Sequence, residues 1–284
     1  MPPLTRERIA FGGETSTGKT YAWMMIARHL PTARFFVVET DDGVKKTLEE
    51  FPDIKDRVFF SRDDENCHLP LVKSWDDFWG KGKGVSQIKI WADAGAVTQN
   101  DWVIIEAADI LYENLRYEFI ERSVVAPRLE NARRGSPQVS SWDVLIEQRK
   151  SQKPAIEPGD WDAINTEFYM AINYLVFQCP CNLIMTFGVE DIREPTGSGS
   201  FSMADAPVLR NFYHNMGMPV KFGGQKRLSR KLDSAVLFGK NLQGFNLQVY
   251  KWRGKNLGGN GVAAVATLVH KDFYVDVLKR VGWE

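Results

Sequence analysis

Gly13-Glu14-Thr15-Ser16-Thr17-Gly18-Lys19-Thr20 fits the phosphate-binding pattern GxxxxGK[ST] at every fixed position. An apolar stretch at 8–11 precedes it and an amphipathic stretch at 19–30 follows it, so the pattern joins an expected strand to an expected helix. Glycines let successive backbone N–H groups point at phosphate oxygens, and the helix N-terminus adds partial positive charge. The alternative is an ordinary glycine turn, but the flanking strand and helix favour a nucleotide-binding loop.

The last two residues of the pattern carry the side chains that act on the nucleotide. The Lys19 ammonium is expected to neutralise the β and γ phosphates of ATP, and the Thr20 hydroxyl to coordinate Mg²⁺. ATP and Mg²⁺ are therefore the expected cofactors. The expected ATP-binding residues are Gly13, Glu14, Thr15, Ser16, Thr17, Gly18, Lys19 and Thr20.

Short apolar strands alternate with amphipathic helical stretches as far as about residue 190, which predicts an α/β fold with a mainly parallel sheet flanked by helices. Two long connections rich in Gly, Ser, Pro and Arg interrupt the pattern, at about 124–159 and 189–230. Residues 1–257 form the expected core, and residues 258–284 a strand and helix extension of the same domain. The strands are expected at 8–11, 35–38, 102–105, 182–186, 235–238 and 246–252, and the helices at 19–30, 76–80, 109–123 and 160–177.

The composition is that of an average globular protein, with 284 residues, 44% hydrophobic and 25% charged. The 36 basic and 36 acidic residues cancel, so any contact with nucleic acid must come from local patches. We expect no membrane contact and a cytoplasmic location, because the sequence shows no signal peptide and no apolar run near the ~20 residues of a membrane span. The three cysteines, Cys67, Cys179 and Cys181, favour buried thiols over a disulfide framework or a metal site.

Polar residues stand at or beyond the ends of three expected strands, where parallel strands converge on a ligand crevice. Glu106 is expected to hold the Mg²⁺ shell together with Thr20, with Asp109 as a fallback ligand. Asp41 is expected to orient the attacking water as general base, and Thr186 to hydrogen-bond the γ-phosphate. Two alternatives stay open: Glu106 merely starts the next helix, and Asp41 belongs to a solvated acidic turn.

The order of these motifs resembles that of the RecA-like core ATPases, most closely the short phage-encoded RecA-like nucleotide-binding proteins associated with recombination and single-strand annealing. The likeness covers about residues 6–255, and only the P-loop is highly specific. Its landmarks in chain order are the P-loop, the acid-ending strand 37–41, Trp-Asp-Asp-Phe at 75–78, the strand 101–106, the helix beginning at Trp161, the strand ending at Thr186, Gly224-Gln225-Lys226 followed by Leu232-Asp233, and Lys251-Trp252-Arg253.

The resemblance implies an ATPase that acts on single-stranded DNA in phage recombination or replication. The implied partners are single-stranded DNA, further copies of the chain in a ring or filament, and phage replication or recombination proteins. Asp41 takes the place of the catalytic carboxylate, usually Glu, and Glu106 the place of the metal-binding Asp, which together imply a slow ATPase or a nucleotide-gated binder. Because the P-loop lies at the start of the sequence, the resemblance argues against a complete cellular recombinase, whose oligomerisation segment normally precedes it.

The two long connections correspond in order to the two DNA-contacting loops of RecA-like proteins. Residues 221–231 carry five basic residues and no acid, and residues 128–153 carry six basic and three acidic residues. Phosphate contact by the cations and base stacking on an aromatic ring suit single-stranded DNA, although a solvated face is the alternative. The expected DNA-binding residues are Lys221, Phe222, Lys226, Arg227, Arg230 and Lys231.

Lys251 and Arg253 follow an alternating strand and resemble the basic pair that RecA-like ring and filament ATPases insert into a neighbour's active site. An arginine supplied in trans stabilises the charge of the phosphoryl-transfer transition state. The alternative is an exposed strand end with solvated charges.

Two other functions remain open. A motor or loader ATPase, for DNA packaging or helicase loading, would share the ATP site and act through duplex DNA or a protein partner. A small-molecule kinase is less favoured, because the long connections lack an obvious acceptor base.

Overall fold

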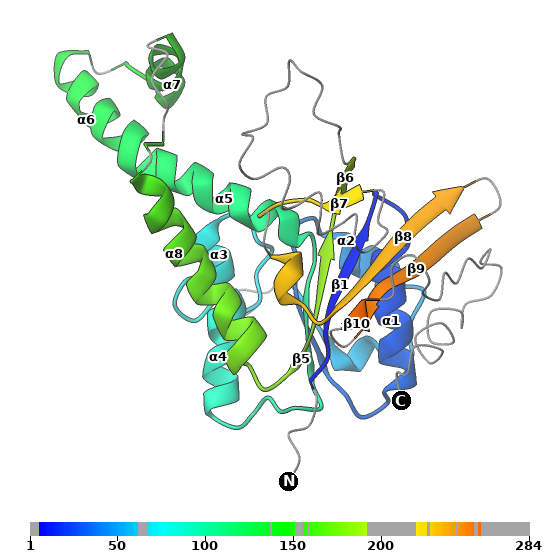
Figure 1. The fold of residues 1–284 in the computed structure, drawn as a ribbon. Coiled ribbons are helices and arrows are strands. Elements are labelled where there is room, and N and C mark those ends of the chain that lie inside the picture. Colours follow the sequence, from blue (N-terminus) through cyan, green and yellow to red (C-terminus); the bar gives the residue numbers. More distant parts are fainter. Residues whose placement is uncertain are drawn as a thin grey trace.

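The computed structural model describes residues 6–61, 68–136, 138–150, 156–157, 159–191, 220–225, 228–241, 244–252 and 255–256. Its centre is an eight-stranded sheet in the order β10-β9-β8-β1-β5-β4-β2-β3 (Figure 1). The strands from β8 to β3 run parallel, whereas β9 and β10 are antiparallel to their neighbours. The bounds are Arg8–Gly13 for β1, Phe35–Val38 for β2, Val58–Phe59 for β3, Trp102–Ile105 for β4, Asn182–Phe187 for β5, Ser234–Asn241 for β8, Gly244–Trp252 for β9 and Lys255–Asn256 for β10.

Helices cover both faces of this sheet, and each face has its own apolar core (Figure 1). Side chains alternate along a strand, so Ile9 and Phe11 of β1 enter one core and Ala10 enters the other. The α/β fold with a mainly parallel, helix-flanked sheet is therefore confirmed. One face carries α1 (Lys19–His29) and α2 (Gly43–Leu48), and the other carries α3 (Trp75–Trp79), α4 (Gly84–Asp93), α5 (Ala108–Ile120) and α8 (Asp160–Asn173).

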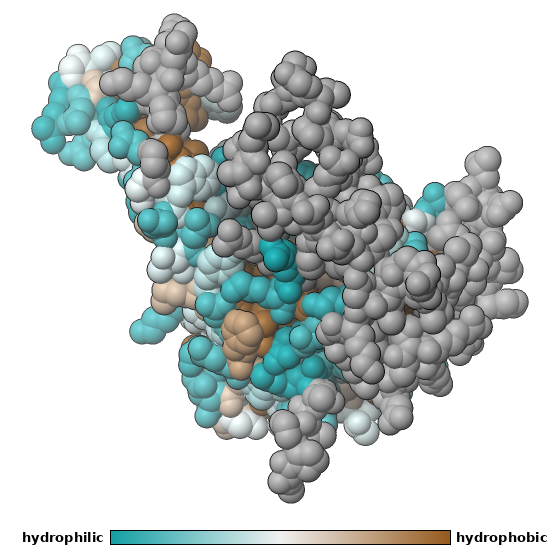
Figure 2. All heavy atoms as spheres, in the orientation of Figure 1, coloured by the Kyte–Doolittle hydropathy of each residue, from teal (hydrophilic) through white to brown (hydrophobic). Residues whose placement is uncertain are grey.

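The first long connection is mostly helical, and its prediction as a polar loop was wrong. The π-helix η2 (Glu121–Val125) joins α5 to α6 (Ala126–Gly135), and α7 (Ser141–Lys150) follows. This arm projects away from the sheet (Figure 1), and both hydrophilic and hydrophobic residues lie at its surface (Figure 2). Pro127, which has no backbone N–H to donate, lies directly after the π-helical turn η2 within this continuous helical stretch. α6 has no buried residue, so its composition is as polar as that of a loop.

The second long connection begins and ends in structure. A two-stranded antiparallel sheet pairs β6 (Val189–Asp191) with β7 (Val220–Phe222), and the 3-10 helix η4 (Ser229–Lys231) follows. Helix α4, strand β3 and the β6–β7 pair were not predicted from the sequence. The expected extension 258–284 and residues 192–219 lie outside the described residues.

Two further expectations concern the thiols and the membrane. Cys179 and Cys181 are buried free thiols, as expected, whereas Cys67 lies outside the described residues. Among the described residues, none of the helices has the length and apolar character needed to cross a lipid bilayer.

Candidate nucleotide-binding site

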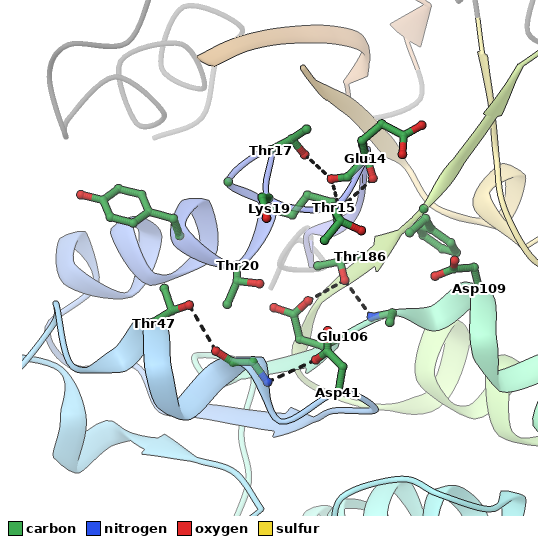
Figure 3. Close-up of a pocket in the computed structure, with 18 of the residues that line it drawn as sticks. Glu14, Thr15, Thr17, Lys19, Thr20, Asp41, Thr47, Glu106, Asp109 and Thr186 are labelled. Carbon is green, nitrogen blue, oxygen red and sulfur yellow. Dashed lines mark hydrogen bonds between the residues drawn. The ribbon is translucent and has the colours of Figure 1, made fainter. Parts of the chain in front are cut away.

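The P-loop turns directly from β1 into α1. Ser16 and Gly18 have left-handed backbone conformations, with φ angles of 63° and 94°. The helix starts at Gly18, whose carbonyl accepts a 2.9 Å hydrogen bond from the Ala22 N–H. Lys19 Nζ donates to the carbonyl oxygens of Gly13 (2.7 Å) and Glu14 (2.9 Å), so its ammonium is held against the loop (Figure 3). Burial lowers the pKa of Lys19, and nearby carboxylates partly offset that effect.

A cavity of about 750 Å³ opens over this loop, a size typical of small-molecule sites. All eight predicted ATP-binding residues line it, which is the direct consequence of the strand, loop and helix geometry. The structure also brings four other predicted side chains to the cavity: Asp41, Glu106, Asp109 and Thr186 (Figure 3).

Glu106 lies immediately after β4 and is 5% exposed. Its Oε1 accepts a 2.5 Å hydrogen bond from the indole Nε1 of Trp23, and its Oε2 accepts a 2.6 Å bond from the Thr186 hydroxyl. Burial raises the pKa of Glu106, against hydrogen bonds from Thr186, Trp23 and Thr20 that lower it. The carboxylate is thus more than the start of a helix, since it links α1, β4 and β5. Trp23 was not predicted as a site residue, although its position one helical turn after Lys19 was a signal.

Thr186 bridges two neighbouring strand ends. Its hydroxyl donates its one proton to Glu106 and accepts a 2.8 Å hydrogen bond from the Ala107 N–H (Figure 3). In this arrangement the hydroxyl has no second proton for a phosphate oxygen. A direct hydrogen bond to a γ-phosphate would require Thr186 to release Glu106.

The two acids beyond β2 have different surroundings. Asp41 is exposed at the edge of the cavity and accepts a 3.3 Å hydrogen bond from the Gly43 N–H. Glu39 is fully buried and accepts hydrogen bonds from the Ser61 hydroxyl and from the Val44 N–H. Burial raises the pKa of Glu39 to about 7. Glu39 does not line the cavity, so it anchors the turn that carries Asp41.

The oxygen atoms around the cavity fit a magnesium ion that arrives with a nucleotide. Mg²⁺ prefers oxygen ligands, keeps several waters and binds through one or two carboxylates plus substrate phosphates. Thr20, Glu106 and Asp109 supply such oxygens, and Asp109 Oδ1 is buried with no hydrogen-bond partner among the described residues. The described part of the chain contains no cluster of three or more His, Cys, Asp or Glu that could hold a metal by itself.

Comparisons with known proteins find similarity among solved structures. No family model and no curated protein matches the chain. The structure is similar to the crystal structure of the RadB recombinase, with a TM-score of 0.43 and 9% sequence identity, over 95% of this chain and 90% of that chain. In this chain the P-loop lies between β1 and α1 of a mainly parallel, helix-flanked sheet, and β5 separates β1 from the Glu106 strand β4.

The expectation that Phe222 stacks on DNA bases was wrong. Phe222 is 5% exposed and stacks on Phe187, with ring centroids 5.4 Å apart. It also covers Gly12 so closely that a Cβ at that position would lie 2.2 Å from the ring. The alternation of β7 turns this aromatic side chain into the core beside the P-loop strand.

The described cations of the basic stretch, Lys221, Arg230 and Lys231, have different surroundings. Lys221 forms a 2.7 Å ion pair with Glu190 across the β6–β7 pair. Lys231 donates to Asn173 at 2.8 Å and lies 4.2 Å from the ring centroid of Tyr169, so it packs against α8. Arg230 is exposed, and the two remaining predicted residues, Lys226 and Arg227, lie outside the described residues.

Lys251 lies at the end of the sheet where β8 begins, whereas the P-loop lies toward the opposite end of the strands. It pairs in register with Ala235 near the start of β8, whereas Gly13 pairs with Phe238 further along that strand. Its Nζ donates to the Leu232 carbonyl at 2.7 Å, and burial lowers its pKa. Lys251 therefore does not reach the cavity of its own chain. Arg253 lies outside the described residues.

Proposed function

We propose that this protein binds ATP with Mg²⁺ at the P-loop cavity and hydrolyses it to ADP and phosphate. The observation that carries this proposal is the convergence of the loop 13–20 with Glu106 and Thr186 on one cavity. The loop amides and the α1 N-terminus suit phosphate oxygens, and the cavity is large enough for a nucleotide.

Each side chain then has a defined task. Lys19 exchanges its two loop carbonyls for phosphate oxygens and neutralises their charge, and Thr20 and Glu106 hold the metal and its waters. Mg²⁺, when bound, supplies charge neutralisation on the β and γ phosphates. Asp41, exposed at the cavity edge, orients the attacking water. Because Asp41 is short and Glu106 is already hydrogen-bonded, the proposed turnover is slow.

The proposed biological setting is phage-type recombination or replication on single-stranded DNA, with copies of the chain in a ring or filament and the protein in the host cytoplasm. The resemblance in motif order supports this setting. Contact with DNA is assigned to Arg230, which is exposed, and to Lys226 and Arg227 of the same basic stretch. Phe222 is not included because it is buried, and Lys231 is not included because it packs against α8. Arg253 is proposed to act on the nucleotide of a neighbouring copy.

A motor or loader ATPase that acts through a protein partner is the second candidate. The arm favours it, because α7 exposes two large apolar side chains one helical turn apart, Trp142 (72% exposed) and Ile146 (46% exposed). Exposed aromatic residues of this kind are common at protein interfaces.

ATP hydrolysis measured alone, with single-stranded DNA and with duplex DNA separates these functions. Strong stimulation by single strands supports the recombination setting, and stimulation by duplex or a protein partner supports the motor. Turnover without either, coupled to phosphorylation of a small molecule, would instead indicate a kinase. An Arg253→Ala protein that regains activity when mixed with a Lys19→Ala protein supports action in trans, whereas normal turnover of Arg253→Ala alone contradicts it.

A further inference from the structure

Trp23 makes a contact that the P-loop motif does not require. It lies on α1, four residues after Lys19, and its side chain is fully buried. Its indole N–H is 2.5 Å from Glu106 Oε1, so the only polar atom of the ring is used on the carboxylate at the end of β4.

Two stacked aromatic rings fix the Trp23 ring in place. Phe35 of β2 lies next to it, with ring centroids 6.2 Å apart and planes 19° apart. Trp102, the first residue of β4, stacks on the other side of Phe35 at 6.0 Å and 10°. The stack therefore runs from Trp102, the first residue of β4, through Phe35 to Trp23. Trp23 in turn hydrogen-bonds Glu106, which follows the last residue of the same strand.

The second oxygen of the carboxylate is fixed as well. Thr186 donates to Oε2 while its own position is set by the Ala107 N–H. Thr20 also hydrogen-bonds this carboxylate, so with three donors it keeps about one acceptor site, and it cannot rotate without breaking a bond. The longer side chain of Glu at this position allows one oxygen to reach each donor.

We propose that Trp23 is a positioning residue, whose indole N–H fixes the orientation of the Glu106 carboxylate and thereby sets the affinity of the ATP site for Mg²⁺. This inference rests on the proposed function. It assigns to Trp23 no contact with nucleotide or metal, because the residue does not line the cavity.

The variant Trp23→Phe retains an aromatic ring, removes the donor and leaves a smaller side chain at a fully buried position. We expect ATP affinity without Mg²⁺ to stay within about twofold of wild type. The Mg²⁺ concentration that half-saturates binding of the Mg²⁺–ATP complex should rise at least about tenfold, as for a lost hydrogen bond to a charged group. Calorimetric titrations with and without Mg²⁺ measure both quantities.

Trp102→Phe is the matched control, because Trp102 belongs to the same stack but makes no bond to Glu106. The Mg²⁺ dependence of this variant should be that of wild type.

A spectroscopic measurement on the wild-type chain does not depend on how the variant folds. With ¹³C,¹⁵N-labelled protein, the nine tryptophans give nine indole N–H signals, which triple-resonance experiments assign. Adding Mg²⁺ to the ATP-bound protein should shift the Trp23 signal, and the signal of Trp91, which packs on the other face of the sheet, should stay in place.

The outcomes separate this inference from the proposed function. If the wild-type protein binds no ATP, the proposed function fails. If it binds Mg²⁺–ATP, but Trp23→Phe has wild-type Mg²⁺ dependence and the Trp23 indole signal does not respond to Mg²⁺, the positioning role is overturned and the ATP site stands.

Discussion

Thr186 and Glu106 are joined by a 2.6 Å hydrogen bond across the ends of two parallel strands. Ile105 of β4 pairs in register with Met185 of β5, so the next residue of each strand lies at the same edge of the sheet. The bond thus follows from strand register, and it ties the side chain expected to sense phosphate to the side chain expected to hold the metal.

Replacing Thr186 with valine keeps the shape of the side chain and removes its hydroxyl. Both the Glu106 carboxylate and the Ala107 N–H lose a partner, so the free energy of unfolding should fall by ~1–3 kcal/mol. ATP turnover should fall as well, because the carboxylate is less well held. Chemical denaturation and steady-state hydrolysis measure the two effects. Thr186→Ser is the control that keeps the hydroxyl, and equal turnover in the valine and wild-type proteins would contradict the assignment.

Replacing Lys19 with alanine removes the cation at the P-loop. The affinity for ATP should fall by about a hundredfold or more, since charge-assisted hydrogen bonds to phosphate are lost. Isothermal calorimetry measures it. Lys45→Ala, at an exposed position on α2, is the control and should bind ATP as wild type does. Undiminished affinity in the Lys19 variant would remove the basis for the ATP site.

Glu39 should make stability depend on pH. Its pKa is raised to about 7 in the folded protein from an ordinary value of 4.5, so the folded state binds more protons between these values. The free energy of unfolding should therefore fall as pH rises from 4.5 to 7, by ~3 kcal/mol from this group, and level off above that range.

Glu39→Gln should abolish this fall, so the variant gains stability relative to wild type as pH rises from 4.5 to 7. Denaturation curves at several pH values measure the difference. Glu49→Gln, at an exposed position in the same segment, serves as control and should show the wild-type dependence. Parallel curves for wild type and Glu39→Gln would show that Glu39 does not titrate in this range.

Phe222 is predicted to stabilise the fold and not to contact DNA. Phe222→Ala should lower the free energy of unfolding by ~3–5 kcal/mol, as for other buried aromatic residues. Tyr117→Ala, 67% exposed on α5, should change it by less than ~0.5 kcal/mol. Phe222→Leu, which retains an apolar side chain, should bind single-stranded DNA as wild type does. A loss of DNA affinity in that variant at unchanged stability would restore the stacking role.

Contact with single-stranded DNA should depend on Lys226, Arg227 and Arg230. Each lost phosphate contact flattens the slope of log affinity against log salt by ~0.7, so replacing all three with glutamine should flatten it by ~2. Fluorescence anisotropy over a salt series measures the slope. Lys231→Gln should leave it unchanged, because Lys231 binds Asn173 and Tyr169. An unaltered slope in the triple variant would place the DNA path elsewhere.

The strands and the nucleotide loop could be predicted because their signals are local. Four apolar residues followed by an acid define β4 and Glu106, and eight residues define the P-loop. The arm could not be predicted from composition, because the polar residues of α6 are those of an exposed helix as much as those of a loop. Helix α6 continues from α5 through a π-helical turn, and nothing in the residue types marks that continuation.

The contacts of a side chain were harder to predict from the sequence than the strand or helix in which it lies. The sequence of the basic stretch 221–231 does not show which of its side chains are buried. In the structure, Phe222 of β7 lies in the core and Lys231 of η4 packs against α8. Glu39 and Asp41 are two residues apart, and only the packing of Ser61 and Val44 decides that Glu39 is the buried one. These outcomes depend on contacts between residues distant in the chain, which a local pattern does not contain.

The continuous helix from α5 through α6 begins two residues after Glu106 and runs to Gly135. At 1.5 Å per residue it is ~40 Å long, and its first turn lies at the nucleotide cavity, which Asp109 and Ile110 line. A tilt of ~5° at Ala108 moves the far end by ~3–4 Å, about the spacing of successive residues along an extended chain. A movement at the cavity that is too small to alter the sheet would thus displace the C-terminal end of α6, which carries α7, by a larger distance.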